Sequence, residues 1–223
     1  MYGWIVSHST YLMVLLGLII GVPVVYRTGF TFNKKSRTGI IPVCVLFSLA
    51  SVASVLLFAS LENLLFSGLW LFGAVSTYGI YLISPLLLAV FAPGKQRAAY
   101  FSAYALYVCP SMILQRIRCL MTGCCIGKVI GSGSLRYPTR EAEILFYLVM
   151  MIVFVKKART TSISERKDWF PVLMMSYSVF RFICEWFREG TGTVHPAHIW
   201  SVLVFLIGLS VYIELHKKTQ LGR

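Results

Sequence analysis

The sequence predicts an all-α polytopic membrane protein with about seven transmembrane helices. Of its 223 residues, 57% are hydrophobic and only 13% are charged, and the mean hydropathy is +0.75. Soluble domains use roughly 45–50% apolar and about 25% charged residues, so the composition excludes an ordinary soluble domain. The apolar residues also gather in runs long enough to span a bilayer. We therefore expect residues 1–223 to form a single integral membrane domain.

Seven apolar runs approach the roughly 17–25 residues that a membrane-spanning helix needs. The fifth run is short unless Glu141 and Glu143 belong to its helix, and the sixth carries Arg181 and Glu185 within it. Charged residues inside a span rarely face lipid, so these two helices should have polar interiors. The first run follows no signal-peptide pattern, and we expect it to stay in the mature protein. In chain order the predicted spans are 11–26, 40–61, 68–92, 98–114, 142–155, 170–187 and 198–215.

The basic residues predict an orientation, because short cytoplasmic loops collect Lys and Arg. The chain has 21 Lys and Arg against 8 Asp and Glu. Alternate loops and the C-terminal tail hold 14 of these cations on one side, which predicts an extracytoplasmic N-terminus and a cytoplasmic C-terminus. This cytoplasmic group comprises Arg27, Lys34, Lys35, Arg37, Lys95, Arg97, Lys156, Lys157, Arg159, Arg166, Lys167, Lys217, Lys218 and Arg223.

A second group of seven cations falls in the opposite half, where the orientation rule does not account for it. Acids are too few to neutralise these cations, whereas a phosphate group would do so. Residues 115–134 also contain four glycines, at 123, 127, 131 and 133, which do not suit a lipid-facing helix. We predict a Gly-rich, re-entrant or partly buried phosphate-binding loop between the fourth and fifth spans; the alternative is an exposed external loop with tolerated cations. The seven cations are Arg116, Arg118, Lys128, Arg136, Arg140, Arg181 and Arg188.

The segment RFICEWFREG in the sixth span places three charges on one helical face. Arg181 and Glu185 are four residues apart, and Glu185 and Arg188 are three apart. One interpretation is a salt bridge that fixes the helix against its neighbours. The other is that Glu185 aims one or both arginines at an anionic headgroup, for which the planar guanidinium is well suited. The two interpretations are compatible.

Three of the six cysteines fall in the cationic loop region and need a separate interpretation. Cys119 could form a disulfide with Cys124 or Cys125, one of the three could be a nucleophile activated by nearby cations, or all could be small packing residues. The adjacent pair does not fit a paired CxxC zinc pattern, so the spacing predicts no metal site. Cys44, Cys109 and Cys184 lie in or beside apolar spans and are interpreted as packing residues.

Three motifs in order resemble those of the bacterial prolipoprotein diacylglyceryl transferases. They are RIRCLMTGCCIGK at 116–128, YPTREAE at 137–143 and RFICEWFRE at 181–189, followed by an apolar run to the C-terminus. In that family the corresponding pattern runs approximately Arg-Ile-Gly-Asn-Phe with a later Gly, then His-Pro-Ser-Gln-Leu-Tyr-Glu, then Arg-Phe-x-x-Glu-Phe-Phe-Arg. The resemblance covers about residue 115 to the end.

The resemblance implies a transferase that moves a diacylglyceryl group from phosphatidylglycerol to a thiol at the outer leaflet and releases glycerol phosphate. The acceptor would be the lipobox cysteine of a prolipoprotein, no metal or organic cofactor would be needed, and no nucleic acid would be bound. Positioned arginines would stabilise the charge that develops on the departing phosphate. The expected catalytic residues are Arg116, Arg181, Glu185 and Tyr78, and the expected substrate-binding residues are Arg118, Gly127, Lys128, Arg136, Arg140, Glu143 and Arg188.

The sequence departs from the family pattern at the expected base. The third span has no His-Gly-Gly motif, and its nearest equivalent is STYGIY with Tyr78 and Gly79. A tyrosine with a pKa near 10 is a poor base unless an arginine lowers it. Other departures are Cys119 in place of Asn, Arg118 in place of Gly, Cys124 in place of an acid and Tyr137 in place of His.

These departures leave three other functions open. A transferase could use phosphatidylglycerol with a different acceptor. A transporter of anionic lipids would also place arginines near a polar cavity, although no inverted repeat is visible. A thiol oxidoreductase could use the loop cysteines, but it would not require three charges on one face of the sixth span.

Overall fold

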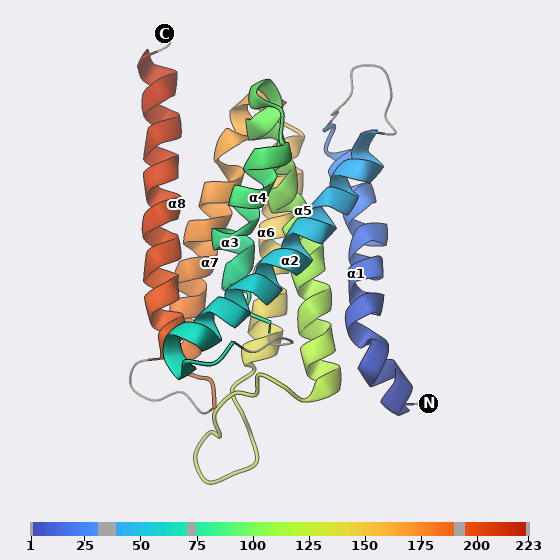
Figure 1. Ribbon diagram of the computed structural model, residues 1–223, viewed down its shortest axis with the longest axis vertical. Coiled ribbons are helices and arrows are strands. Elements are labelled where there is room, and N and C mark those ends of the chain that lie inside the picture. The colour runs from blue at the N-terminus through green and yellow to red at the C-terminus, as the bar shows by residue number, and fades with distance from the viewer. Residues whose placement is uncertain (1, 31–38, 71–74, 190–194, 222–223) are drawn as a thin grey trace.

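The structure is a computed structural model that describes residues 2–30, 39–70, 75–189 and 195–221. Within these residues every named element is helical, which confirms the all-α class (Figure 1). The 3₁₀ helices η2 (Gly94–Gln96) and η3 (Ile163–Asp168) lie in connections. The α-helices are α1 (Tyr2–Arg27), α2 (Ile40–Ser67), α3 (Tyr78–Leu82), α4 (Ser84–Phe91), α5 (Arg97–Thr122), α6 (Thr139–Ala158), α7 (Trp169–Glu185) and α8 (Pro196–Leu221).

Helix α5 is buried along most of its length and holds the bundle together. It packs against α1, α6 and α7, and its buried residues run from Tyr100 to Cys119. Helix α2 crosses the bundle diagonally, from the upper end of α1 toward the lower end of α8 (Figure 1). Its 28 residues span about 42 Å at ~1.5 Å per residue, longer than a ~30 Å hydrocarbon layer, so a tilt keeps its apolar length within a bilayer. Gly68, in the left-handed conformation, ends it.

The third predicted span, 68–92, is wrong as a continuous helix. Gly68 ends α2, residues 69, 70, 75 and 76 are not helical, and α3 and α4 are two short helices that meet at Ile83. Pro85 lies in the first turn of α4, and because proline has no N–H it cannot continue the α3 hydrogen-bond pattern. A Cβ at Gly79 would collide with the Ser54 carbonyl of α2, so glycine permits α3 to lie directly against α2.

Helix α6 begins before the fifth predicted span, 142–155, and so includes the two glutamates without which that span would be short. Glu141 and Glu143 both lie in its first two turns, and Glu143 is buried. The cause is the stretch TREAE, whose residues favour a helix and whose acids suit its N-terminal end. Helix α6 therefore carries a carboxylate into the protein interior.

Connections with basic residues gather at one end of the bundle, the upper end in Figure 1, together with the C-terminus. Arg27 ends α1 there, Lys156 and Lys157 lie in the last turn of α6, and η3 follows them. The lower end carries the α5–α6 loop and the N-terminus (Figure 1). This common placement matches the predicted cytoplasmic group, whereas the orientation in the membrane stays a prediction. Lys34, Lys35, Arg37 and Arg223 lie outside the described residues.

Arg166 belongs to the predicted cytoplasmic group but is a buried residue. Its guanidinium donates hydrogen bonds to the carbonyls of Thr28, Ala158 and Thr161 at 2.6–3.1 Å. It therefore joins the end of α1 to the α6–η3 connection. The loop cations that set the orientation of a membrane protein are instead expected to face solvent.

Helix surfaces that face away from the bundle are apolar. Leu49, Leu86 and Val90 are 64%, 68% and 78% exposed. Among the described residues, α2 and residues 196–217 of α8 are long and apolar enough to cross a membrane, and 12–27 and 78–91 are shorter apolar stretches. The outward-facing apolar side chains suit contact with lipid.

Candidate active site

The α5–α6 loop is held against the end of α7 by main-chain hydrogen bonds. Gly123, in the left-handed conformation, ends α5. The Lys128 amide then donates to the Phe187 carbonyl at 2.8 Å, and the Glu189 amide donates to the Ile126 carbonyl at 3.0 Å. This pairing places residues 124–128 beside the RFICEWFRE motif, although the two are some sixty residues apart in sequence.

The predicted loop begins later than the sequence analysis proposed. Residues 115–122 form the last two turns of α5, so their inclusion in an irregular loop is wrong. They contain no glycine, and the helix ends only where Gly123 allows it. Residues 129–137 are exposed, while Gly127 is buried. Arg116 and Arg118 are consequently presented by a helix, which fixes their positions more firmly than a loop would.

Arg116, Glu143 and Arg181 form a buried ion network between α5, α6 and α7. The Arg116 Nε lies 2.9 Å from Glu143 Oε2, and the Arg181 Nη1 lies 3.4 Å from Glu143 Oε1. All three side chains are 2–7% exposed. One carboxylate thus faces two guanidinium groups, each contributed by a different helix.

Glu185 extends this network toward the loop. Its Oε2 lies 2.8 Å from Arg181 Nη2 and 3.3 Å from Arg188 Nη1, which confirms the shared face predicted from the sequence. Its Oε1 lies 3.3 Å from the Nδ1 of His195, which precedes α8. These ion pairs join three arginines to two glutamates. Guanidinium groups gathered in one place favour the binding of an anion such as a phosphate.

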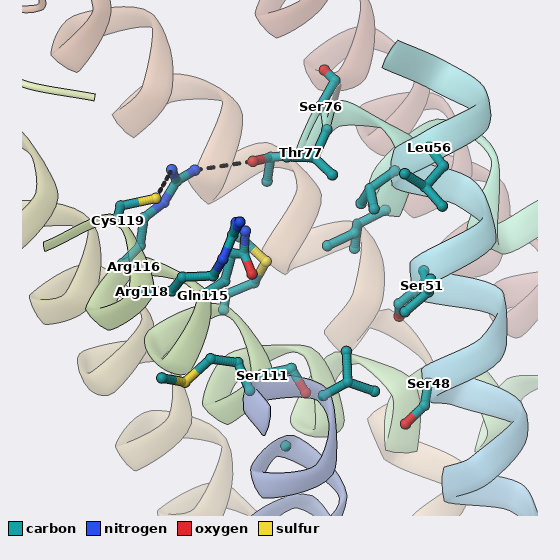
Figure 2. A pocket seen from close by; sticks show the side chains of 18 of the residues that line it. Ser48, Ser51, Leu56, Ser76, Thr77, Ser111, Gln115, Arg116, Arg118 and Cys119 are labelled. Atoms are coloured by element: carbon teal, nitrogen blue, oxygen red, sulfur yellow. Dashed lines mark hydrogen bonds between the residues drawn. The ribbon is translucent and has the colours of Figure 1, made fainter. Parts of the chain in front are cut away.

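A cavity of about 230 Å³ lies beside Arg116, between α1, α2 and α5. Its walls near α1 and α2 are mostly aliphatic, with scattered hydroxyl groups (Figure 2). At one end the Arg116 Nη2 donates a 2.9 Å hydrogen bond to Thr77 Oγ1, and Arg118 also lines this end. A space with apolar walls and a cationic end suits a molecule with hydrocarbon chains and an anionic headgroup.

Cys119 of α5 and Cys124 and Cys125 of the α5–α6 loop line the same end of the cavity. The Arg116 Nη1 lies 3.8 Å from Cys119 Sγ and 3.9 Å from Cys125 Sγ. Each of the three cysteines is a free thiol in the structure. The disulfide, the nucleophile and the packing role all stay predictions.

Cys125 lies beyond the end of α5, and the pKa of its thiol is lowered. A hydrogen bond with the Cys119 thiol lowers the pKa of the Cys125 thiol, against the effect of burial. The positive charges of Arg188 and Arg116 lower this pKa further.

Four other predicted substrate-binding residues lie around the loop and not in the ion network. The Arg136 Nη1 lies 2.5 Å from Glu189 Oε2 in a surface pair, and the Arg140 Nη1 donates to the Cys119 carbonyl at 3.4 Å. Lys128 joins the loop through its backbone to Phe187, just after α7. A Cβ at Gly127 would collide with the Tyr137 carbonyl, so this glycine permits the loop to close on itself. Ligand binding by these residues stays a prediction.

Tyr78 is buried and its hydroxyl has partners in α8. It donates a 2.7 Å hydrogen bond to the Ala197 carbonyl and lies 2.8 Å from Ser201 Oγ. Tyr78 is not among the residues that line the cavity, whereas the preceding Thr77 is. Its contacts join α3 to α8, and a catalytic role for it stays a prediction.

Sequence reasoning missed three residues that the structure brings to the site. Thr77 accepts the Arg116 hydrogen bond, the Tyr177 hydroxyl lies 3.5 Å from Glu143 Oε1, and His195 approaches Glu185. Tyr177 could have been found from its spacing, since it lies four residues before Arg181 on α7. Thr77 and His195 come from connections whose paths the sequence pattern does not specify.

The model of the prolipoprotein diacylglyceryl transferase family matches residues 6–214. The chain belongs to that family. The match confirms the resemblance drawn from the three motifs and extends it from the C-terminal half to nearly the whole chain. The family is one of transferases in lipoprotein biosynthesis, which places the ion network and the cavity in a transferase. No curated protein matches the chain.

Proposed function

We propose that this protein transfers a diacylglyceryl group from phosphatidylglycerol to a thiol acceptor at the outer leaflet of a bacterial plasma membrane. Arg116 carries the proposal, because it belongs to the buried ion network and also lines the cavity. Its fixed guanidinium has a carboxylate on one side and the cavity end on the other.

The reaction requires a carbon–oxygen bond to break with the electron pair leaving on a phosphate. A donor with its acyl chains along the apolar walls would place that phosphate at Arg116 and Arg118. Arginines held in a water-poor site stabilise developing negative charge without reorganising, which is the largest contribution in many enzymes. Glu143 and Glu185 hold the arginines in place and reduce their mutual repulsion.

A direct assay tests the proposal. Purified protein would be incubated with phosphatidylglycerol and a lipobox peptide, and mass spectrometry would follow the diacylglyceryl peptide and glycerol phosphate. Both products should appear together in equal amounts. A matched peptide with serine in place of the cysteine should stay unmodified. Phosphatidylglycerol consumption without peptide product would indicate a different acceptor, and lipid movement across vesicles without either product would indicate a transporter.

Replacing Arg116 by lysine tests the role of its guanidinium. Lysine keeps the charge but cannot contact Glu143 and Thr77 at the same time, so Arg116→Lys should fold and lose about 10²-fold in transfer rate. Arg159→Lys is the control, because Arg159 is exposed and follows the C-terminal end of α6, away from the ion network. That variant should transfer lipid at the natural rate. A folded Arg116→Lys protein with full activity would contradict the assignment.

A further inference from the structure

Cys119, Cys124 and Cys125 form a compact thiol cluster at the cationic end of the cavity. Their three Sγ atoms all lie within 4.8 Å of one another. Three thiolates bound to one tetrahedral zinc ion, at about 2.3 Å each, would lie about 3.8 Å apart. Small side-chain rotations therefore convert the observed arrangement into a ligand set.

The backbone at Cys125 has the conformation that brings adjacent cysteines together. Cys125 has a φ of 58°, and it is the one non-glycine residue with positive φ among the described parts of the chain. In extended backbone, consecutive side chains point to opposite sides. The left-handed conformation costs roughly 1–2 kcal/mol for a residue with a Cβ, so the surrounding contacts must hold it. One of these contacts is the 3.1 Å hydrogen bond from Thr139 Oγ1 to the Cys125 carbonyl.

We propose that Cys119, Cys124 and Cys125 bind one soft metal ion, zinc foremost, and that its fourth coordination position takes the thiol of the acceptor. Catalytic zinc sites characteristically have three protein ligands and one open position. Among the residues that the structure describes, no other His, Cys, Asp or Glu joins the cluster. All three cysteines line the cavity, so the fourth position is open to it.

The charges around the cluster suit this ligand set. Three thiolates with one divalent zinc ion carry a net charge of −1, and the guanidinium group of Arg116 beside them is positively charged. Arg116 Nη1, at 3.8–3.9 Å from two of the sulfur atoms, is placed to donate to them. Hydrogen bonds of this kind orient metal ligands and tune their affinity.

The role of the metal rests on the proposed transfer reaction. The third span has no His-Gly-Gly motif to supply a base, and the metal would activate the acceptor thiol instead. An acceptor thiol would bind zinc as a thiolate and release its proton to water. Its sulfur then attacks the glyceryl carbon of the donor. The new S–C bond forms as the C–O bond to phosphate breaks, and the electron pair leaves with glycerol phosphate. No electron is gained or lost by the metal.

Metal content gives the first test. The natural protein, purified from membranes without chelator and loaded with zinc, should retain about one ion per chain. Each of the variants Cys119→Ser, Cys124→Ser and Cys125→Ser should lower zinc affinity by more than the roughly 10–100-fold that loss of an outer hydrogen bond costs. Cys109→Ser is the control, because Cys109 is buried in α5 away from the loop, and this variant should bind zinc like the natural chain. Cys124 is exposed, so Cys124→Ser should fold even if the other two variants do not.

Cobalt(II) provides a spectroscopic test of the open position. The cobalt protein should show thiolate-to-cobalt charge-transfer absorption, and a lipobox peptide should change its ligand-field bands while the serine peptide does not. Three results would each overturn the proposal: a disulfide within the cluster of the natural protein, no bound metal, or cobalt ligand-field bands that do not change when the cysteine peptide is added. These measurements do not use lipid, so they test the metal site separately from the transfer reaction. Metal and peptide binding without lipid transfer would refute the proposed function but would still support the metal site.

Discussion

At the scale of single residues, Glu143 determines how the site is charged. It is 2% exposed and faces the guanidinium groups of both Arg116 and Arg181. Moving charges out of water costs several kcal/mol each, and the cost is offset only while partners remain in good geometry. Structural ion pairing and a role in the reaction are therefore not alternatives at this site, because the carboxylate that stabilises the arginines also fixes where they point.

Removing the charge of Glu143 should destabilise the protein and abolish most transfer activity. Glu143→Gln leaves two buried arginines with less compensation, and we expect a loss of about 3–5 kcal/mol of unfolding free energy. The control is Glu189→Gln, which breaks the exposed pair with Arg136 and should cost only about 0–1 kcal/mol. Thermal unfolding in detergent or nanodiscs measures both. Equal melting temperatures would show that Glu143 does not support the arginines.

At the scale of elements, the site depends on how the α5–α6 loop closes against α7. The loop forms isolated bridges between Gly127 and Arg188 and between Val129 and Arg136. The first bridge connects the segment that follows the cysteines to the RFICEWFRE motif, and the second pairs two parts of the loop with each other. Helix α5 contributes Arg116 and Cys119 from consecutive turns, so the ion network and the thiol cluster share one rigid support.

A side chain at Gly127 should loosen this closure. Gly127→Ala places a Cβ against the Tyr137 carbonyl, and overpacking of this kind costs about 1–3 kcal/mol. Activity should fall, and proteolysis within 123–138 should become faster. Gly133→Ala is the matched control, because a Cβ there meets nothing closer than 3.9 Å and Gly133 does not have a positive φ. If both variants are cleaved at the same rate as the natural protein, the close packing at Gly127 has no part in holding the loop.

At the scale of the whole molecule, the bundle separates its charged groups between two ends. The ion network and the α5–α6 loop lie toward the lower end in Figure 1, whereas η3 and the C-terminus lie at the upper end. In the proposed reaction the lipid headgroup and the acceptor meet at the outer surface of the membrane, so the lower end should face outward. Arg166 is unsuitable as a marker of the inner side, since it is buried.

Cysteine labelling can determine this orientation. Ser134 in the α5–α6 loop and Ser164 in η3 are both exposed. In intact cells a membrane-impermeant maleimide should label Ser134→Cys above the level of the natural chain, while Ser164→Cys should be labelled only after the cells are opened. The reverse pattern would place the arginines and the thiol cluster on the cytoplasmic side and contradict the proposed acceptor.

Much of the fold and the centre of the site followed from the sequence by itself. Apolar runs fixed the all-α class because a backbone in lipid must satisfy its own hydrogen bonds. The spacing of Arg181, Glu185 and Arg188 fixed their common face because helix geometry is local. The excess of cations in the extracytoplasmic half pointed to the candidate site. A charge at membrane depth is unfavourable whatever the tertiary structure, so this signal can be seen in the sequence alone.

Only the tertiary structure decided which charges meet and what else joins them. Glu143 on α6 contacts arginines of α5 and α7, Thr77 and His195 arrive from connections, and three cysteines converge at a cavity. These are contacts between segments distant in sequence, and no periodicity encodes them. The break between α3 and α4 was missed for the same reason: an apolar run has the same composition whether its helix is continuous or is interrupted where it packs against α2.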